Sequence, residues 1–327
     1  MVFSVLAENF KTHKSLLNHN NEIGLCETLI NMPEDTEFLV VEMGMRGLGE
    51  IELLSKYAEP DFAVITNIGT AHIGRLGSLE NIAKAKCEIV KYLKPDGILI
   101  AFDDELIKNF CGWNGKKIYY GKNYQILETT ENSIKFIYDE NEYKLTVNGE
   151  FNVINSIAAI EIGKLSGISV EKIRHGLLKY KPVGERGRVI KLNKNIKIIA
   201  DYYNANPDSM KASINSVIST YPDYDITLVL GDMGELGEYE NKMHSEIGEF
   251  LSNKHFSQLV TVGEKAKLIA NSIKNKNIKI ETCITNQEAA EYLKNNTLEN
   301  GIILLKASRS MKFEEIAEEL QKVKTEV

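Results

Sequence analysis

The chain has 327 residues, 43% of them hydrophobic and 26% charged, and its 39 basic and 46 acidic side chains give a net charge of −7. Such a composition is that of a globular protein with room for two domains, and the acidic excess disfavours a general nucleic-acid or membrane-surface role. The four cysteines form no CxxC pair, no apolar run is long enough to span a membrane, and the N-terminus does not have the pattern of a signal peptide, so we expect a cytoplasmic protein.

The first part of the chain alternates between helical and extended patterns. We expect an amphipathic helix over 1–10, buried strands over 37–41, 62–66 and 97–102, and helices over 49–57 and 79–93. Short apolar runs separated by helical periods are typical of a parallel sheet that is covered by helices on both faces. Three segments with a short antiparallel-strand pattern follow (KKIYYG, SIKFIY and EYKLTV), and then helices over 152–165 and 170–180.

A second alternation begins after segment 181–188, whose proline, glycines and charges favour a linker. Strands are expected over 196–200, 227–230, 258–262, 278–283 and 301–305, and helices over 207–220, 239–252, 264–274, 287–293 and 313–323. The predicted fold class is therefore α/β, with a parallel-sheet domain over 1–184 and a second, Rossmann-like nucleotide-fold domain over 185–327.

Polar side chains gather where the predicted strands end, which is where ligands bind in parallel α/β sheets. Five strand ends carry such groups, which is more than loops require. They are Glu42; Asn67, Thr70 and His72; Asp201, Tyr203, Asn204 and Asn206; Asp232 and Glu235; and Lys306, Ser308 and Arg309.

Several of these residues also have a purely structural explanation. A lone glutamate after a strand, such as Glu42, is more often a cap or a surface charge, and a lone His72 is more often a loop histidine; two such ligands do not define a metal site. In YNANPDSM, Asn206 or Asp208 would cap a helix that begins at the proline. Lys86 lies among other lysines in the helical segment GSLENIAKAKCEIVKYL, where a solvated face is the simpler explanation.

Glycine-rich phosphate-binding loops are absent from this sequence. GMRGLGE at 44–50 matches neither GxGxxG nor a Walker loop, and no GxxxxGK[ST] pattern occurs. A nicotinamide dehydrogenase and a self-contained P-loop enzyme are both disfavoured.

Seven segments occur in an order that chance does not explain: NHNNEIG, VVEMGMRGLGEI, NIGTAHIGRLGSLENIAKAKCEI, GEFNVINSIAA, DYYNANPDSM, GDMGELGEYENKMH and KASRSM. On these segments the chain resembles the Mur ligases, the ATP-dependent amide ligases of cell-wall precursor synthesis. YNANP together with GDMGELG resembles the branch that adds D-alanyl-D-alanine, and not the branches that add earlier stem residues.

The resemblance implies a reaction and its partners. ATP phosphorylates the terminal carboxylate of a UDP-N-acetylmuramoyl-tripeptide, the amine of D-alanyl-D-alanine attacks the acyl phosphate, and phosphate leaves. Mg²⁺ is implied because the nucleotide and the transition state carry dense negative charge.

The resemblance also implies roles for individual residues. Glu42, His72 and Lys86 would bind Mg²⁺, with Lys86 converted to a carbamate that supplies anionic oxygen. The residues implied in ATP binding are Asn155, Arg186, Asp201, Tyr203 and Asn204, with Arg188 as the alternative to Arg186. The residues implied in contacts with the precursor, or in lining the C-terminal domain's side of the site, are Asn20, Asn21, Asp232, His244, Lys306, Ser308 and Arg309.

The sequence departs from the family pattern in two ways. Leu17, Cys26, Phe151 and Ala307 stand where the pattern has Gly, Pro, His and Gly. The family also begins with a UDP-binding domain, a strand and a GKT-type loop that this sequence does not contain. Because that strand belongs inside the central sheet, we expect FLVV and FAVIT each to lack a neighbour, and residues 1–327 alone not to catalyse ligation.

Two alternatives to this enzyme stay open. One is a non-catalytic Mur-like protein that binds precursor, nucleotide or a partner chain, and relies on that partner to complete the sheet. The other is a related ligase that acts on different amino-acid polymers.

Overall fold

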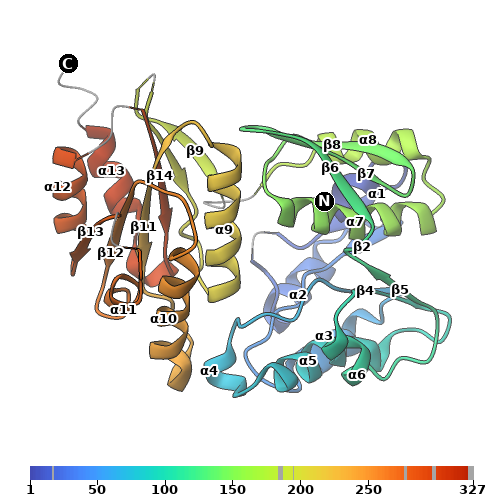
Figure 1. The fold of residues 1–327 in the computed structure, drawn as a ribbon. Helices are drawn as coiled ribbons and strands as arrows, with labels where there is room; N and C mark the ends of the chain where they lie inside the picture. Colours follow the sequence, from blue (N-terminus) through green and yellow to red (C-terminus); the bar gives the residue numbers. More distant parts are fainter. Residues whose placement is uncertain (17, 183–186, 194, 276–277, 297–299, 323–327) are drawn as a thin grey trace. The chain divides into compact units, whose positions relative to one another are not determined.

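A computed structural model describes the chain except for residues 17, 183–186, 194, 276–277, 297–299 and 323–327 (Figure 1). It has two compact units, Met1–Lys181 and Pro182–Val327. The boundary expected between 184 and 185 lies outside the described residues. Within the described residues, no helix is both long enough and apolar enough to cross a membrane.

The parallel strands of the first unit form two sheets instead of the single sheet expected. β1 (Thr12–Lys14) pairs with β2 (Phe38–Val40), whereas β3 (Phe62–Ile65), β4 (Ile98–Phe102) and β5 (Lys117–Tyr120) form a three-stranded sheet. In the part of the chain that the structure describes, β2 pairs only with β1 and β3 only with β4, as expected for FLVV and FAVIT. The prediction of a buried strand is wrong for β2, whose residues are only partly buried.

The segment after β4 differs from the antiparallel prediction at one strand. β5 runs parallel to β4, because the connection through α6 (Glu105–Phe110) returns the chain to the same end of the sheet. The antiparallel sheet consists of β6 (Tyr124–Thr130), β7 (Ser133–Tyr138) and β8 (Asn141–Leu145). Phe136 and Tyr143 of this sheet share a buried core with Val5 of α1 (Val2–Leu6), Ile157 of α7 (Glu150–Leu165) and Ile173 of α8 (Val170–Leu178).

Local sequence signals explain where several helices of this unit begin. Ser78 accepts a hydrogen bond from the backbone N–H of Asn81, and Asp104 and Ser169 act in the same way at the starts of α6 and α8. The remaining bounds are α2 (Glu22–Ile30), α3 (Glu50–Ala58), α4 (Ile73–Leu76), α5 (Leu79–Cys87) and the 3-10 turn η1 (Glu88–Tyr92).

The second unit contains a six-stranded sheet in the order β13-β12-β11-β14-β10-β9, in which only β9 is antiparallel to its neighbour. All residues of the inner strands β10, β12 and β14 are buried, as continuous apolar strands between helices should be. The strands are β9 (Arg188–Lys191), β10 (Lys197–Ala200), β11 (Asp225–Gly231), β12 (Gln258–Val262), β13 (Lys279–Cys283) and β14 (Gly301–Lys306). This parallel topology confirms the predicted α/β class.

Helices flank both faces of this sheet (Figure 1). They are α9 (Pro207–Thr220), η2 (Gly237–Tyr239), α10 (Glu240–Leu251), α11 (Lys267–Asn271), α12 (Asn286–Asn296), η3 (Arg309–Met311) and α13 (Glu314–Lys322). Asn206 and Ser209 form a reciprocal capping box at the start of α9, with Pro207 as the first helical residue. Of the two capping candidates, Asn206 is therefore the cap.

Candidate functional site

Glu42 lies directly beyond the carboxyl end of β2 and contacts another predicted residue. Its carboxylate accepts a hydrogen bond from Asn20 Nδ2 at 3.0 Å, and its backbone N–H donates to Ser15 Oγ at 3.3 Å. The N–H of Gly44 donates to the carbonyl of Asn20 at 2.7 Å, and a side chain on Gly44 would collide with the Asn20 carboxamide. The structure thus brings Glu42 and Asn20 together and adds Ser15, which has no motif of its own in the sequence.

Lys86 lies in the last turn of α5 and reaches the carboxyl end of β3. Its Nζ donates to the carbonyl of Asn67 at 2.6 Å. The solvated-face explanation fits Lys84, which is exposed and lies with its Nζ 5.2 Å from the ring centroid of Phe110. Lys86 is partly buried and points at a strand end, which is the place where ligands bind in parallel sheets.

His72 has an unusual backbone conformation. It lies at the N-cap of α4 in the left-handed region, with φ 63° and ψ 17°. This conformation costs an L-residue about 1 kcal/mol, and such strain collects at functional sites, where the surrounding structure imposes it. Six other non-glycine residues in the described part of the chain also have a positive φ, so this conformation by itself does not mark His72 as a site residue.

A magnesium site at these residues requires a chemical change at Lys86. Within the described residues, no three His, Cys, Asp or Glu side chains come together as a metal site. Glu42 and His72 need a further ligand, and an unmodified lysine ammonium group is a donor only. A carbamate on Lys86 would supply oxygen atoms, the ligands that Mg²⁺ prefers. With that modification the three side chains offer donor types that suit Mg²⁺, whereas an unmodified ammonium group could not make Lys86 one of its ligands.

Three further predicted residues have contrasting surroundings. Asn21 is the N-cap of α2, where its Oδ1 accepts a hydrogen bond from the N–H of Gly24 at 2.9 Å. Its carboxamide therefore already has a structural role. Asn155 is exposed on α7, and Tyr203 is partly buried in the loop that leads to α9. Of these three residues, Asn21 and Asn155 are exposed and Tyr203 is partly buried.

The two arginine candidates lie on either side of Gly187. Arg186 lies outside the described residues, as does Leu17, one of the departures from the family pattern. Arg188 is exposed at the start of β9, opposite Ala200 at the end of β10. Arg188 therefore lies beside the strand that leads to Asp201.

Asp201 and Lys306 form a largely buried ion pair at the ends of two neighbouring parallel strands, β10 and β14. Lys306 Nζ lies 3.0 Å from Asp201 Oδ2 and donates to the carbonyl of Asn204 at 2.8 Å. The hydroxyl of Ser213, on α9, donates to the same carboxylate. The Lys306 side chain is only 4% exposed, so the Asp201 carboxylate compensates an ammonium group that has little contact with water. The structure thus brings together three predicted residues and adds Ser213.

His244 holds the GDMGELG loop from inside the unit. The residue is fully buried; its Nε2 accepts a hydrogen bond from the N–H of Met233 at 3.0 Å, and its Nδ1 donates to the carbonyl of Glu240 at 2.7 Å. Burial lowers the pKa of His244, which keeps the ring neutral. Because both ring nitrogens are used internally, His244 positions this loop, in place of the direct contact with substrate that the resemblance implied.

Asp232 also stabilises a backbone turn. Its Oδ1 accepts hydrogen bonds from the N–H groups of Lys265 and Ala266, at 3.0 and 2.7 Å. Gly263 adopts a φ of 110°, and a Cβ there would lie 2.5 Å from the Asp232 carboxylate. Both the positive φ and the close approach of the Asp232 carboxylate therefore favour glycine at position 263, in the turn before α11.

Ser308 and Arg309 follow β14 at the same edge of the sheet. The N–H of Ser308 donates to the carbonyl of Asp232 at 3.2 Å, and Ser308 Oγ accepts from the N–H of Gly234 at 2.7 Å. Arg309 is exposed and pairs with Glu314 at 2.8 Å. An exposed pair of this kind is weak enough to be exchanged for a ligand.

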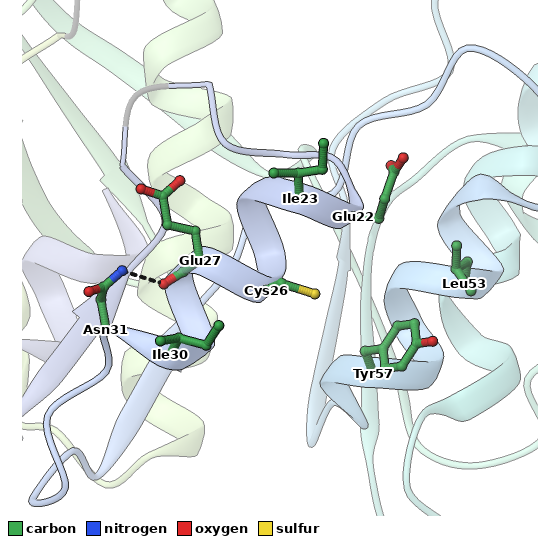
Figure 2. Close-up of a pocket in the computed structure, with 8 residues that line it drawn as sticks. All are labelled: Glu22, Ile23, Cys26, Glu27, Ile30, Asn31, Leu53 and Tyr57. Carbon is green, nitrogen blue, oxygen red and sulfur yellow. Dashed lines mark hydrogen bonds between the residues drawn. The ribbon is translucent and has the colours of Figure 1, made fainter.

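A pocket of about 650 Å³ lies between α2 and α3. In Figure 2, the thiol of Cys26 points toward the helix that carries Leu53 and Tyr57. Its lining consists of Glu22, Ile23, Cys26, Glu27, Ile30, Asn31, Leu53 and Tyr57. None of the predicted site residues is among these eight, although Asn21 is the N-cap of α2, the helix that supplies most of the lining.

Two domain families match the chain, one in each half. The Mur ligase middle domain matches residues 1–163, and the Mur ligase, glutamate ligase domain matches residues 185–309. The chain belongs to the Mur ligase family.

Relatives in this family align with nearly the whole chain. The UDP-N-acetylmuramoyl-tripeptide--D-alanyl-D-alanine ligase of Bacillus subtilis is 40% identical over 331 residues, which cover 98% of this chain and 72% of the relative. The ligase of the same name from Escherichia coli is 28% identical and covers 98% of this chain and 73% of its own length.

Solved structures extend the likeness to three dimensions. MurF from Acinetobacter baumannii matches with a TM-score of 0.89 at 26% identity, over 98% of this chain and 73% of that chain. MurF ligase from Thermotoga maritima in complex with ADP matches with a TM-score of 0.84 at 26% identity, over 99% and 76%. The chain spans roughly three quarters of the length of these relatives.

Proposed function

We propose that this chain carries the ATP-dependent ligase chemistry that joins D-alanyl-D-alanine to a UDP-N-acetylmuramoyl-tripeptide. The observation that supports this most strongly is the 40% identity, over 98% of the chain, to a Bacillus subtilis ligase of that name. Glu42, Asn67 and Lys86 at the strand ends of the first unit add support from geometry.

The reaction has two steps. An oxygen of the tripeptide's terminal carboxylate attacks the γ-phosphorus of ATP, and ADP leaves. The amine of D-alanyl-D-alanine then attacks the acyl carbon, loses a proton, and expels phosphate as the amide bond forms. Both steps concentrate negative charge, so positioning and electrostatic stabilisation provide most of the catalysis.

Glu42, His72 and a carbamate on Lys86 would hold Mg²⁺, which would neutralise charge on the phosphates. Asn20 orients the Glu42 carboxylate through the hydrogen bond at 3.0 Å. The carbonyl of Asn67 holds Lys86 Nζ, which places the nitrogen that would take up carbon dioxide. In this proposal, Asn20 and Asn67 are positioning groups.

The nucleotide is assigned to Asn155, Arg186, Asp201, Tyr203 and Asn204. Lys306 orients two of them, because its Nζ contacts both the Asp201 carboxylate and the Asn204 carbonyl. The precursor and the incoming dipeptide are assigned to the remaining candidates, with His244 acting only through the loop that it holds. These candidates are Asn20, Asn21, Asp232, Ser308 and Arg309.

The test compares two proteins: residues 1–327 alone, and the same residues joined to the part of the Bacillus subtilis relative that they do not match. Each receives ATP, Mg²⁺, D-alanyl-D-alanine and UDP-N-acetylmuramoyl-tripeptide. Ligated product is followed by mass spectrometry and phosphate release by a coupled assay. By the family pattern the added part carries the GKT-type loop, so product is expected from the joined protein.

The controls separate the ligase from its alternatives. D-alanine alone and glycylglycine should give no product. A joined protein that binds the tripeptide precursor tightly but forms no product would favour the binding-protein alternative. Equal ligation of unrelated amino acids would favour a ligase of other polymers.

A further inference from the structure

The pocket between α2 and α3 has walls of exposed apolar side chains (Figure 2). Ile23 and Ile30 of α2 are 71% and 82% exposed, and Leu53 and Tyr57 of α3 are 41% and 57% exposed. Single exposed apolar residues are normal on a protein surface, but these four line one hollow of about 650 Å³, a volume typical of small-molecule sites. The pocket therefore has both the volume and the apolar walls to take up the body of an organic molecule.

The charged side chains of the lining have one sign. Both are glutamates of α2, Glu22 and Glu27, and the described lining contains no lysine or arginine. The Oε2 of Glu27 lies 3.2 Å from the Nδ1 of His19. The Glu22 carboxylate, in contrast, forms no ion pair with any residue that the structure describes. The pocket therefore disfavours an organic anion, whereas a cation finds a carboxylate that has no competing partner in the described chain.

We propose that this pocket is a binding site for an organic ammonium ion with an apolar body. The ammonium group pairs with the Glu22 carboxylate, and the body packs against Ile30, Leu53 and Tyr57. The site shares no residue with those assigned to ligation and does not depend on the ligase function.

Each part of such a ligand has a matching group in the pocket. The face of an aromatic ring attracts cations, so Tyr57 favours the same sign of charge as Glu22 does. Removal of the apolar body from water supplies most of the affinity, since an exposed ion pair alone is weak. A neutral molecule of the same shape keeps only the apolar contacts, and an anion is repelled by Glu22. The expected order of affinity is cation, then neutral molecule, then anion.

Cys26 provides a reporter inside the pocket. It is exposed and its thiol points toward α3, whereas Cys87, Cys111 and Cys283 are buried (Figure 2). Methyl methanethiosulfonate, an uncharged reagent specific for thiols, should therefore label Cys26 first in the folded chain. Labelling is followed by peptide mapping, with Cys26→Ser to give the background and glutathione to detect any direct effect of a probe on the reagent.

The experiment measures how three probes with one apolar body slow the labelling of Cys26 in residues 1–327. At neutral pH phenylbutylamine is a cation, phenylbutanol is neutral and phenylbutanoate is an anion. Phenylbutylamine should protect Cys26 at the lowest concentration and phenylbutanoate at the highest. Protection that is equal for the three probes, or absent with the amine, would overturn the proposal.

Two substitutions separate the charge from the apolar body. Glu22→Gln should raise the half-protecting concentration of phenylbutylamine by about two- to fivefold, the effect of an exposed ion pair, and leave that of phenylbutanol unchanged. Glu34→Gln, at an exposed glutamate outside the lining, is the matched control and should change neither. Tyr57→Ala should weaken protection by both probes, whereas Tyr57→Phe, which keeps the ring, should preserve it. Equal effects of Glu22→Gln and Glu34→Gln would remove Glu22 from the site.

Two further measurements test for other occupants of the pocket. A labelling rate that falls as the chain is concentrated, with no probe present, would show that a second copy covers the pocket. Loss of Cys26 reactivity in the joined protein would show that the added part covers it. Either result would contradict a small-molecule site, which requires Cys26 to stay reactive until the amine is added.

Discussion

The carboxylate of Glu88 accepts two hydrogen bonds from the single N–H of Gly49, at 2.8 and 2.9 Å. It accepts a third, at 3.3 Å, from the N–H of Glu52. Glu88 is buried and lies two residues beyond Lys86, and Gly49 is the N-cap of α3 with a φ of 87°. A buried carboxylate therefore satisfies backbone N–H groups at the start of α3, the helix that follows the loop after Glu42.

We expect Glu88→Gln to destabilise the first unit by about 1–3 kcal/mol, because a neutral amide is a weaker acceptor for N–H groups at a helix N-terminus. Urea unfolding followed by tryptophan fluorescence isolates this unit, since Trp113 is the one tryptophan in the sequence. The matched control is Glu52→Gln, which breaks only an exposed pair with Lys91 and should cost less than about 1 kcal/mol. Equal midpoints for the two variants would contradict the capping role.

Lys86→Arg should abolish ligation by the joined protein and leave its fold intact. Arginine keeps the positive charge but does not take up carbon dioxide as a carbamate. Carbon-13 NMR with labelled bicarbonate should show a carbamate signal in the parent protein that this variant lacks. Lys84→Arg, on the exposed face of the same helix, should keep both signal and turnover. Near-normal turnover of Lys86→Arg would remove Lys86 from the site.

Glu42→Ala should raise the Mg²⁺ concentration needed for half-maximal ligation. It should also lower the maximal rate, to an extent that corresponds to a loss on the order of several kcal/mol of transition-state stabilisation, which is what a bound metal ion contributes. Glu59→Ala provides the control, since Glu59 is an exposed carboxylate at the C-cap of α3. If magnesium titrations of the two variants superimpose, Glu42 is a structural carboxylate.

Stability of the second unit should fall as the pH drops below about 6.5, the ordinary pKa of histidine. Burial lowers the pKa of His244 in the folded state, so the unfolded chain binds the proton more readily and acid favours unfolding. Protonation of Nε2 would also break the hydrogen bond from Met233. The contribution of His244 is therefore present above pH 6.5 and lost below it.

Unfolding midpoints in urea at pH 8 and pH 5.5 measure this effect. A transition that appears in circular dichroism but is absent from Trp113 fluorescence is assigned to the second unit. His244→Asn should lower the midpoint at pH 8 and reduce its pH dependence, whereas His255→Asn, at an exposed position, should change neither. An unaltered pH dependence in His244→Asn would assign the titration to another group.

Local sequence signals determined the elements that depend on their own residues. The helix predicted over 207–220 has those bounds in the structure, because Asn206, Pro207 and Ser209 specify its start without help from the rest of the chain. The strand predicted over 258–262 likewise has those bounds as β12, and Gly263 follows it directly. The order of motifs was enough to indicate the family.

The tertiary structure alone decided which elements and side chains meet. The sequence of KKIYYG is compatible with either strand direction, and only the return through α6 made β5 parallel to β4. His244 and Glu88 look like other polar residues on helices, yet each is buried against backbone groups that are distant in the sequence. The reason is physical: caps and turns are set by neighbours in sequence, whereas burial, pairing and pKa depend on partners that only folding brings together.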